Sequence, residues 1–259
     1  MTEQDIMLKA ENLHLGYNGR TVLKDVNFSV RAGEIFGILG NSGCGKSTLL
    51  KHLIGIYTPV GGSISLLGEK LDPSSPEADK NLMTRIGVTY QGGALFGSMT
   101  VAENVALPLE LHTDKSKEEI HAIVQKKLEL VDLADFGSFM PGELSGGMRK
   151  RAGLARALAL DPKLLFFDEP SAGLDPLAAA NLDSLILAMR KDLGVTVVIV
   201  THELDSIFSI TDRVIVIDKR EKTVVAAGDP RKLRTDSDNQ FVRNFLNRDG
   251  LKRSFTANG

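Results

Sequence analysis

Several things are scarce in this chain, and each shortage excludes a class of protein. The 259 residues contain a single cysteine, Cys44, which excludes an internal disulfide. No segment approaches the roughly 18 consecutive apolar residues that span a bilayer, so any role at a membrane must come through a partner. The first residues, Met1–Asp5, lack a basic region followed by an apolar stretch. We therefore expect no signal peptide and a cytoplasmic location.

Excess charge is also lacking, because the formal net charge is −2. This balance gives no bulk attraction for nucleic acid or anionic lipid, and we expect no nucleic-acid partner. Two local basic runs, Lys126–Lys127 and Arg149–Arg151, interrupt the balance. We interpret both as solvated helix faces.

A glycine-rich loop is the most informative motif present. Residues 40–47 fit G-x-x-x-x-G-K-[ST], whose backbone N–H groups point at nucleotide phosphates. An apolar stretch, Glu34–Leu39, predicts a buried strand before the loop, and Ser47–Ile54 predicts a helix after it. The helix N-terminus favours anions, so we expect Lys46 to reach the β and γ phosphates and Ser47 to bind Mg²⁺. Cys44 is expected to be a bystander. The predicted ATP-binding residues of this loop are Gly40, Asn41, Ser42, Gly43, Cys44, Gly45, Lys46, Ser47 and Thr48.

Two further apolar runs end in polar side chains. Leu164–Phe167 is followed by Asp168 and Glu169, and Val195–Val200 is followed by Thr201-His202. Open α/β sheets bind ligands at the carboxyl ends of their strands. We expect Asp168 to hold Mg²⁺ and Glu169 to orient or deprotonate the attacking water.

The segment Leu144-Ser145-Gly146-Gly147, together with the loop at 40–47 and the pair Asp168-Glu169, resembles the motif set of the ATP-binding cassette (ABC) family. In that family Ser145, Gly146 and Gly147 would begin a helix that meets the γ-phosphate held by the other subunit's loop. The resemblance therefore implies a homodimer, with ATP and Mg²⁺ as the bound species. It covers about residues 7 to 230.

The same resemblance implies roles for further residues. Tyr17 corresponds to the aromatic residue that stacks on adenine. Gln91 corresponds to the glutamine that reaches Mg²⁺ and water and links the site to the transport partner. Asp175 corresponds to the aspartate that communicates across the dimer, and His202 to the histidine that contacts the γ-phosphate.

The expected fold class is α/β, an ABC ATPase with a RecA-like P-loop core, an antiparallel β subdomain and an inserted helical subdomain. We assign 1–91 and 162–235 to the core with its β subdomain, 92–161 to the helical subdomain and 236–259 to a C-terminal tail. Asn18-Gly19 predicts a hairpin. Helices are expected from about Ser116 and over Met148–Leu160.

Within the tail, Asp236–Asn239 is expected to cap a short helix that carries Phe241, Phe245 and Leu246 on one face. We regard this helix as a candidate for binding a partner or folding back on the core. The residues from Arg248 onward are polar and poorly patterned.

A finer resemblance is to the ATPases of MCE-type lipid transport systems. It is carried by Gln91–Phe96 and Leu144–Ala152, with Met148 and Gly97 at positions where many cassette ATPases have glutamine and proline. This branch implies phospholipid transport between membranes, with a permease pair, a periplasmic MCE-domain protein and, in some systems, a STAS-domain protein. The ATPase would lie at the cytoplasmic face of the inner membrane, bound through the permease.

Two alternatives stay open on the sequence. Another importer or exporter branch would share every catalytic residue. A soluble cassette ATPase acting on nucleic acid or ribosomes is less favoured, because such proteins usually carry long heptad insertions or two cassettes in one chain.

Overall fold

A long hairpin opens the fold. The computed structural model describes residues 6–17, 19–72 and 76–248. Strands β1 (Ile6–Tyr17) and β2 (Arg20–Arg31) pair antiparallel, with Tyr17 opposite Arg20. The predicted hairpin is confirmed, although Asn18 itself lies outside the described residues. β4 (Gly61–Leu66) and β5 (Glu69–Lys70) complete a four-stranded antiparallel sheet in the order β2-β1-β4-β5.

A second, six-stranded sheet has the order β10-β9-β3-β8-β7-β6 and is parallel except for β10 at its edge. Its strands are β3 (Ile35–Gly40), β6 (Ile86–Thr89), β7 (Leu164–Asp168), β8 (Thr196–Val200), β9 (Arg213–Asp218) and β10 (Thr223–Gly228). Every residue of β3 and β8 is buried. Parallel strands covered on both faces read as continuous apolar runs, which is why the sequence revealed them.

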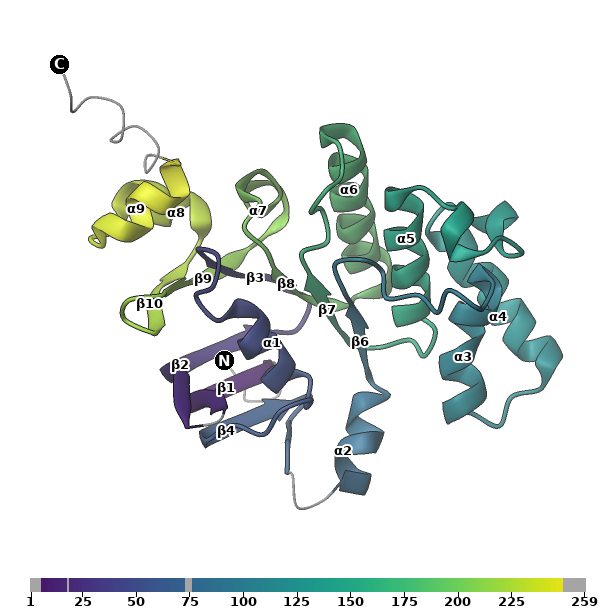
Figure 1. Ribbon diagram of the computed structural model, residues 1–259, viewed down its shortest axis with the longest axis horizontal. Helices are drawn as coiled ribbons and strands as arrows, with labels where there is room; N and C mark the ends of the chain where they lie inside the picture. Colours follow the sequence, from purple (N-terminus) through teal and green to yellow (C-terminus); the bar gives the residue numbers. More distant parts are fainter. Residues whose placement is uncertain (1–5, 18, 73–75, 249–259) are drawn as a thin grey trace.

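Helices cover both faces of the parallel sheet, and Figure 1 shows α3, α4 and α5 grouped at one end of the molecule and α8 and α9 at the other. The helices are α1 (Lys46–Leu53), α2 (Pro76–Met83), α3 (Val101–His112), α4 (Lys117–Leu130), α5 (Gly146–Ala157), α6 (Pro176–Leu193), α7 (Leu204–Ile210), α8 (Pro230–Asp236) and α9 (Gln240–Asn247), with 3₁₀ turns η2 (Ala134–Phe136) and η3 (Pro141–Glu143). None of them, within the residues described, has the length and apolar character to cross a bilayer.

The core is divided by the parallel sheet. On one face Phe36 and Phe166 pack with α1 and the antiparallel sheet. On the other, Leu165 and Phe167 pack with α3, α4, α5 and α6. Successive strand side chains point to opposite faces, so Phe166 and Phe167 belong to different clusters although they are adjacent. The expected α/β class, with an antiparallel subdomain beside a P-loop sheet, is confirmed.

The predicted helices at 116 and 148 are present. Ser116 caps α4 and Ser145 caps α5, each with its hydroxyl accepting a backbone N–H. Helix α3 was not predicted. Its signal lies in Thr100 and Glu103, which form a capping box, since each side chain accepts the other's backbone N–H.

The interpretation of the basic runs as solvated faces is wrong for most of their members. Arg149 donates to the carbonyl of Leu144, Arg151 to that of Val131, and Lys150 to carbonyls that follow β7. Lys127 pairs with Asp161, and its side chain is only 12% exposed. A cationic head on a long apolar stem can reach backbone acceptors while its stem packs, which a sequence pattern does not reveal.

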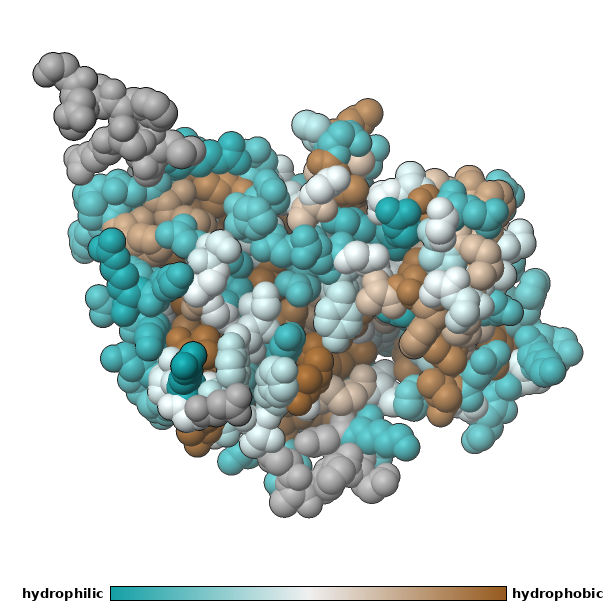
Figure 2. All heavy atoms as spheres, in the orientation of Figure 1, coloured by the Kyte–Doolittle hydropathy of each residue, from teal (hydrophilic) through white to brown (hydrophobic). Residues whose placement is uncertain are grey.

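The tail helix is present and lies against the core. Asn239 caps α9, and Val242 and Leu246 are buried against β9 and α7. Phe241 and Phe245, which are partly buried, stack with ring centroids 6.1 Å apart. Figure 2 shows apolar surface over α8 and α9, framed by hydrophilic residues. Of the two expectations for this helix, folding back on the core is confirmed. The segment 249–259 lies outside the described residues.

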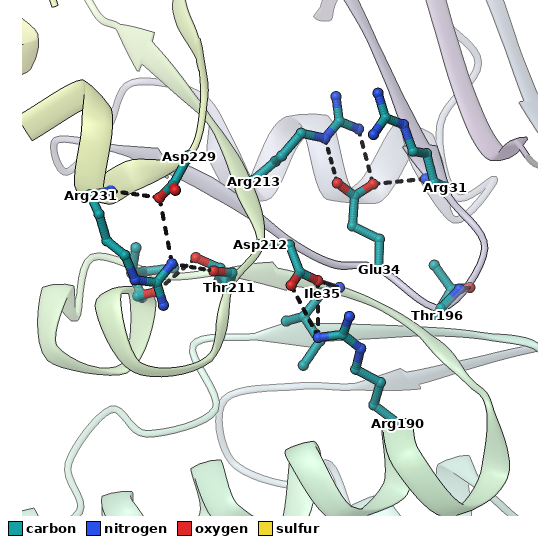
Figure 3. Close-up of polar contacts among 12 residues, drawn as sticks. Arg31, Glu34, Ile35, Arg190, Thr196, Thr211, Asp212, Arg213, Asp229 and Arg231 are labelled. Atoms are coloured by element: carbon teal, nitrogen blue, oxygen red, sulfur yellow. Dashed lines mark hydrogen bonds and ion pairs between the residues drawn. The ribbon is translucent and has the colours of Figure 1, made fainter. Parts of the chain in front are cut away.

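A polar cluster fixes the amino ends of β3 and β9 (Figure 3). Arg213 donates to both carboxylate oxygens of Glu34, and Glu34 also accepts the backbone N–H of Arg31 at 2.8 Å. Asp212 accepts the backbone N–H of Ile35 at 2.9 Å and is paired with Arg190 of α6. These contacts hold the amino ends of β3 and β9 in place. They therefore help to position the carboxyl ends of the same strands at the opposite edge of the sheet.

Candidate functional site

The carboxyl ends of four neighbouring parallel strands form one edge. Ile38 of β3 and Asp168 of β7 both pair with Val200 of β8, and Thr89 of β6 pairs with Phe167. The loop at 40–48, Thr201-His202, Asp168-Glu169 and Tyr90-Gln91 follow these positions directly. The topology therefore brings together at this edge the residues predicted from separate motifs.

The glycine loop has the backbone needed for an anion site. Gly45 precedes α1 with φ of 108°, and a Cβ there would lie 3.0 Å from side-chain atoms of Val22 and Leu23. No side chain caps α1, and its first turn contains no acidic residue. The N-terminal N–H groups are thus left for an anion. Lys46 is buried and its Nζ donates to the carbonyl of Gly40 at 2.7 Å, which places the ammonium within the loop.

The other loop residues differ in access. Asn41, Ser42 and Ser47 are exposed, whereas Cys44 is buried. Burial raises the pKa of the Cys44 thiol, as expected for an unreactive packing residue. Tyr17, at the end of β1, is 54% exposed, so its ring is accessible to a planar ligand.

Asp168 has the environment of a cation ligand. Its Oδ1 is buried and, among the described residues, has no hydrogen-bond partner. Burial raises the pKa of Asp168, the charge of Glu169 adds to that rise, and Lys51 and Lys46 oppose it. The orphaned carboxylate oxygen of Asp168 and the hydroxyl of Ser47 in the loop at 40–48 are hard oxygen donors of the kind that Mg²⁺ prefers. The described residues contain no cluster of three or more His, Cys, Asp or Glu side chains that would hold a metal alone.

Glu169 is held in an unusual conformation. Its φ is +50°, in the left-handed region, and its N–H donates to the carbonyl of Val200 at 2.8 Å. Thr201 Oγ1 donates to Oε2 at 2.9 Å, and His202 Nδ1 lies 2.9 Å from Oε1. A non-glycine residue in this region costs roughly 1–3 kcal/mol, and such strain is concentrated at functional sites.

The segment Ser145–Gly147 begins α5 as predicted, but on the other side of the parallel sheet from α1. Residues of α1 belong to one core cluster and residues of α5 to the other. Ser145 Oγ accepts the N–H of Met148 at 3.2 Å, and a Cβ at Gly146 would meet nothing within 4 Å. Among the described residues, no hydrogen bond or ion pair joins this segment to the loop at 40–48. Asp175, also exposed, caps α6 by accepting the N–H groups of Leu177 and Ala178.

Gln91 is exposed two residues after β6. The turn that follows it lies against α5. Gly93 has φ of +78°, and a Cβ there would lie 2.6 Å from the carbonyl oxygen of Arg149.

Asn104 was missed by sequence reasoning. It is fully buried, and its side chain bonds the backbone N–H of Phe96 and the carbonyls of Phe96, Met99 and Thr100. A lone Asn in the apolar face of α3 was the available signal.

Comparison with known proteins decides the family. A family model described as "ABC transporter" matches residues 23–172. The chain belongs to the ABC transporter family. It is an ABC-type ATPase, which binds and hydrolyses ATP, and the expected fold and enzyme class are confirmed.

Among curated relatives of this ABC ATPase, "Probable ribonucleotide transport ATP-binding protein mkl" of Mycobacterium leprae is 41% identical over 242 residues, 93% of this chain and 69% of that protein. "Intermembrane phospholipid transport system ATP-binding protein MlaF" of Escherichia coli K12 is 40% identical over 232 residues, 90% of this chain and 84% of that one. Two differently named transport systems are therefore almost equally similar.

Solved structures agree on the fold. The structure of cbiO1 from Clostridium perfringens, described as part of the ABC transporter complex cbiONQ, has a TM-score of 0.82 and 31% identity, covering 95% of this chain and 98% of that one. The dimeric post-hydrolysis state of the ATP-binding cassette MJ0796, bound to ADP and Pi, has a TM-score of 0.77 and 29% identity, covering 86% and 98%.

Proposed function

We propose that this ABC ATPase powers phospholipid transport between membranes, bound to a permease pair that works with an MCE-domain protein. The observation that carries this proposal is the segment from Gln91 to Gly97 together with Met148, where the chain departs from the general cassette pattern in the way the MCE branch does. The 40% identity to MlaF supports it. A STAS-domain protein is a further expected partner.

Each site residue has a proposed role. Lys46 and the free N–H groups of α1 bind the β and γ phosphates, and Tyr17 stacks on adenine. Ser47, Asp168 and Gln91 hold Mg²⁺, which neutralises phosphate charge when bound. The buried, unpartnered Oδ1 of Asp168 supports that assignment.

For hydrolysis, Glu169 accepts a proton from a water whose oxygen bonds to the γ-phosphorus. The bond from that phosphorus to the bridging oxygen breaks, and its electron pair leaves with ADP. His202 holds the γ-phosphate and, through Nδ1, orients Glu169. The contacts that Thr201 and His202 make with the carboxylate fix its direction before substrate arrives.

The complete site is proposed to need two copies of the chain, joined head to tail. Ser145 to Gly147 of one copy would then meet the nucleotide held at Lys46 of the other, with Asp175 near the interface. The position of α5 on the far side of the sheet from α1 supports this arrangement, because one chain does not bring the two segments together. The dimeric form of MJ0796 adds support. ATP would then stabilise the closed pair only until the γ-phosphate is cleaved.

We propose that residues 92–161 act as a helical subdomain against the core at 1–91 and 162–235, with 236–259 as the C-terminal tail. A cavity of about 260 Å³ lies between α2, β6, α3 and α5. It is a suitable seat for the permease, which would hold the ATPase at the cytoplasmic face of the inner membrane.

Ribonucleotide transport is a second candidate, because the 41% identity to the mkl protein is close to the 40% identity to MlaF. No side chain of the ATPase site would differ between the two, since the transported molecule meets the permease and not this subunit.

Purification of the chain from its native membrane in mild detergent, followed by mass spectrometry of bound proteins and lipids, tests the proposal. A permease with an MCE-domain protein and phospholipid is the expected result. A permease with a solute-binding protein would leave the ATPase intact and reject phospholipid as the transported molecule. Nucleic acid or ribosomal proteins would reject the transporter assignment.

A further inference from the structure

Lys150 has no role in the proposed chemistry, yet it joins two parts of the site. It lies on α5, one turn after Ser145–Gly147. Its Nζ donates to the carbonyls of Pro170 at 2.6 Å and Ala172 at 2.5 Å, and lies 3.5 Å from that of Glu169. These acceptors belong to the turn that follows β7. One side chain therefore ties the start of α5 to the backbone beside the carboxylate proposed to act on water.

In this contact one ammonium group binds several backbone carbonyls of the same turn. An ammonium group has three N–H donors, and the three carbonyls match them in number. Burial lowers the pKa of Lys150, and the nearby charge of Glu169 opposes that change. Burying a cation is costly unless its donors are satisfied, so the turn and the lysine hold each other in place.

The turn needs such support because Glu169 is strained. Its φ of +50° lies where residues other than glycine are disfavoured. The carbonyl of Glu169 accepts the N–H of Ala172 at 3.3 Å, and Ala172 in turn offers its own carbonyl to Lys150. If these carbonyls were released, the backbone could relax, and the carboxylate would turn away from Thr201 and His202.

We infer that Lys150 is a positioning residue for Glu169 and links the direction of that carboxylate to the position of α5. The inference rests on the proposed role of Glu169. In the proposed dimer, Ser145–Gly147 touches the nucleotide of the partner copy, while Glu169 serves the nucleotide of its own copy. A shift of α5 caused by the nucleotide in one site is thereby transmitted through Lys150 to Glu169, which serves the nucleotide in the other site. The two sites of the dimer are therefore coupled.

Lys150→Met, which keeps the stem and removes the donors, tests this inference. In the full chain, purified with the subunits that accompany it, we expect kcat for ATP to fall about 10- to 100-fold, since a displacement near 1 Å has effects of that size. KM and the binding of a fluorescent ATP analogue should stay within about twofold, because Lys46 and the loop at 40–48 are untouched. Lys150→Arg, which keeps cationic donors, should restore most of kcat.

The matched control is Lys126→Met, the same change at an exposed lysine of α4, which should leave kcat unchanged. Normal turnover of Lys150→Met, beside a slow Glu169→Gln variant, would overturn the inference and leave the role of Glu169 standing. Loss of analogue binding in both Lys150 variants would also overturn it, because that pattern means a folding defect. Normal turnover of Glu169→Gln would overturn the proposed role and the inference together.

Discussion

The imidazole Nδ1 of His202 lies 2.9 Å from Oε1 of Glu169, and Thr201 holds the other carboxylate oxygen at 2.9 Å. A carboxylate only accepts hydrogen bonds, so Nδ1 carries a proton in this contact. Both oxygens of Glu169 are thus oriented by the two residues that follow β8. His202 is 57% exposed and Glu169 only 16%, which makes the histidine the more accessible member of the pair.

Replacing Glu169 by Gln should separate binding from hydrolysis. The amide keeps the shape of the side chain but is a far weaker base. We expect the rate of phosphate release to fall on the order of 10²- to 10⁴-fold, the usual contribution of a general base. ATP should still bind, and an ATP-bound dimer should accumulate on gel filtration. Normal turnover would reject Glu169 as the residue that acts on water.

His202 and Glu169 should behave as one unit in a double-mutant cycle. In His202→Ala the carboxylate loses an orienting partner, so Glu169→Gln should cost much less in that background than in the wild type. The measurement is kcat for the four proteins. His121→Ala, at an exposed histidine of α4, is the control and should leave kcat unchanged. Additive effects would mean that the two side chains act independently.

The parts of the fold visible in the sequence are those with a strong local signal. The apolar runs that became β3, β7 and β8 predicted a buried parallel sheet, and the residues after them predicted its functional edge. The capping serines Ser116 and Ser145 marked helix starts correctly.

What escaped prediction depends on contacts between distant segments. Lys150 reads as one of three adjacent cations, and only the fold shows that its head meets backbone 19 to 22 residues away. Glu169 combines a strained φ with a hydrogen bond from its N–H to the carbonyl of Val200 in β8, a contact that no local pattern encodes. Asn104 was overlooked because its partners, the carbonyls of a loop, carry no sequence signature.

The substitution Gly146→Ala should weaken formation of the dimer without destabilising the fold of the single chain. A Cβ at Gly146 meets nothing within 4 Å in the single chain, and Ala at the start of α5 is no worse for the helix. Stability should therefore stay equal or rise by up to about 1 kcal/mol. ATP-dependent dimerisation and turnover should fall, since the new methyl group would occupy the space proposed for the partner's phosphate.

Gly142→Ala provides the matched control. Gly142 is also exposed, a Cβ there also meets nothing within 4 Å, and it lies four residues earlier in η3. Thermal melting and ATP-dependent light scattering on both variants make the comparison. Equal loss of dimer in both variants, or none in Gly146→Ala, would contradict the placement of Gly146 at the interface.

Asp183 should destabilise the protein increasingly as pH rises. It is a buried residue of α6, its Oδ1 has no partner among the described residues, and burial raises its pKa while a hydrogen bond with Ser206 opposes the rise. A raised carboxyl pKa means that the native state binds the proton more tightly than the unfolded state. The free energy of unfolding therefore falls as pH rises from the ordinary carboxyl pKa through the raised one. Asp183→Asn removes the buried charge and should stabilise the protein by about 1 kcal/mol at pH 8, and by less at pH 5.

Urea denaturation of the wild type and Asp183→Asn at both pH values measures this difference. Asp192→Asn is the control, because Asp192 is exposed on the same helix and its replacement should change stability by no more than about 0.5 kcal/mol at either pH. A variant less stable than the wild type at pH 8 would show that the Asp183 carboxylate is stabilising where it lies. The expected gain in stability would instead show that the Asp183 charge is destabilising where it is buried, between α6 and α7. These two helices follow Asp175 and His202, respectively. Because Asp183 lies outside the proposed chemistry, turnover should change little while stability rises.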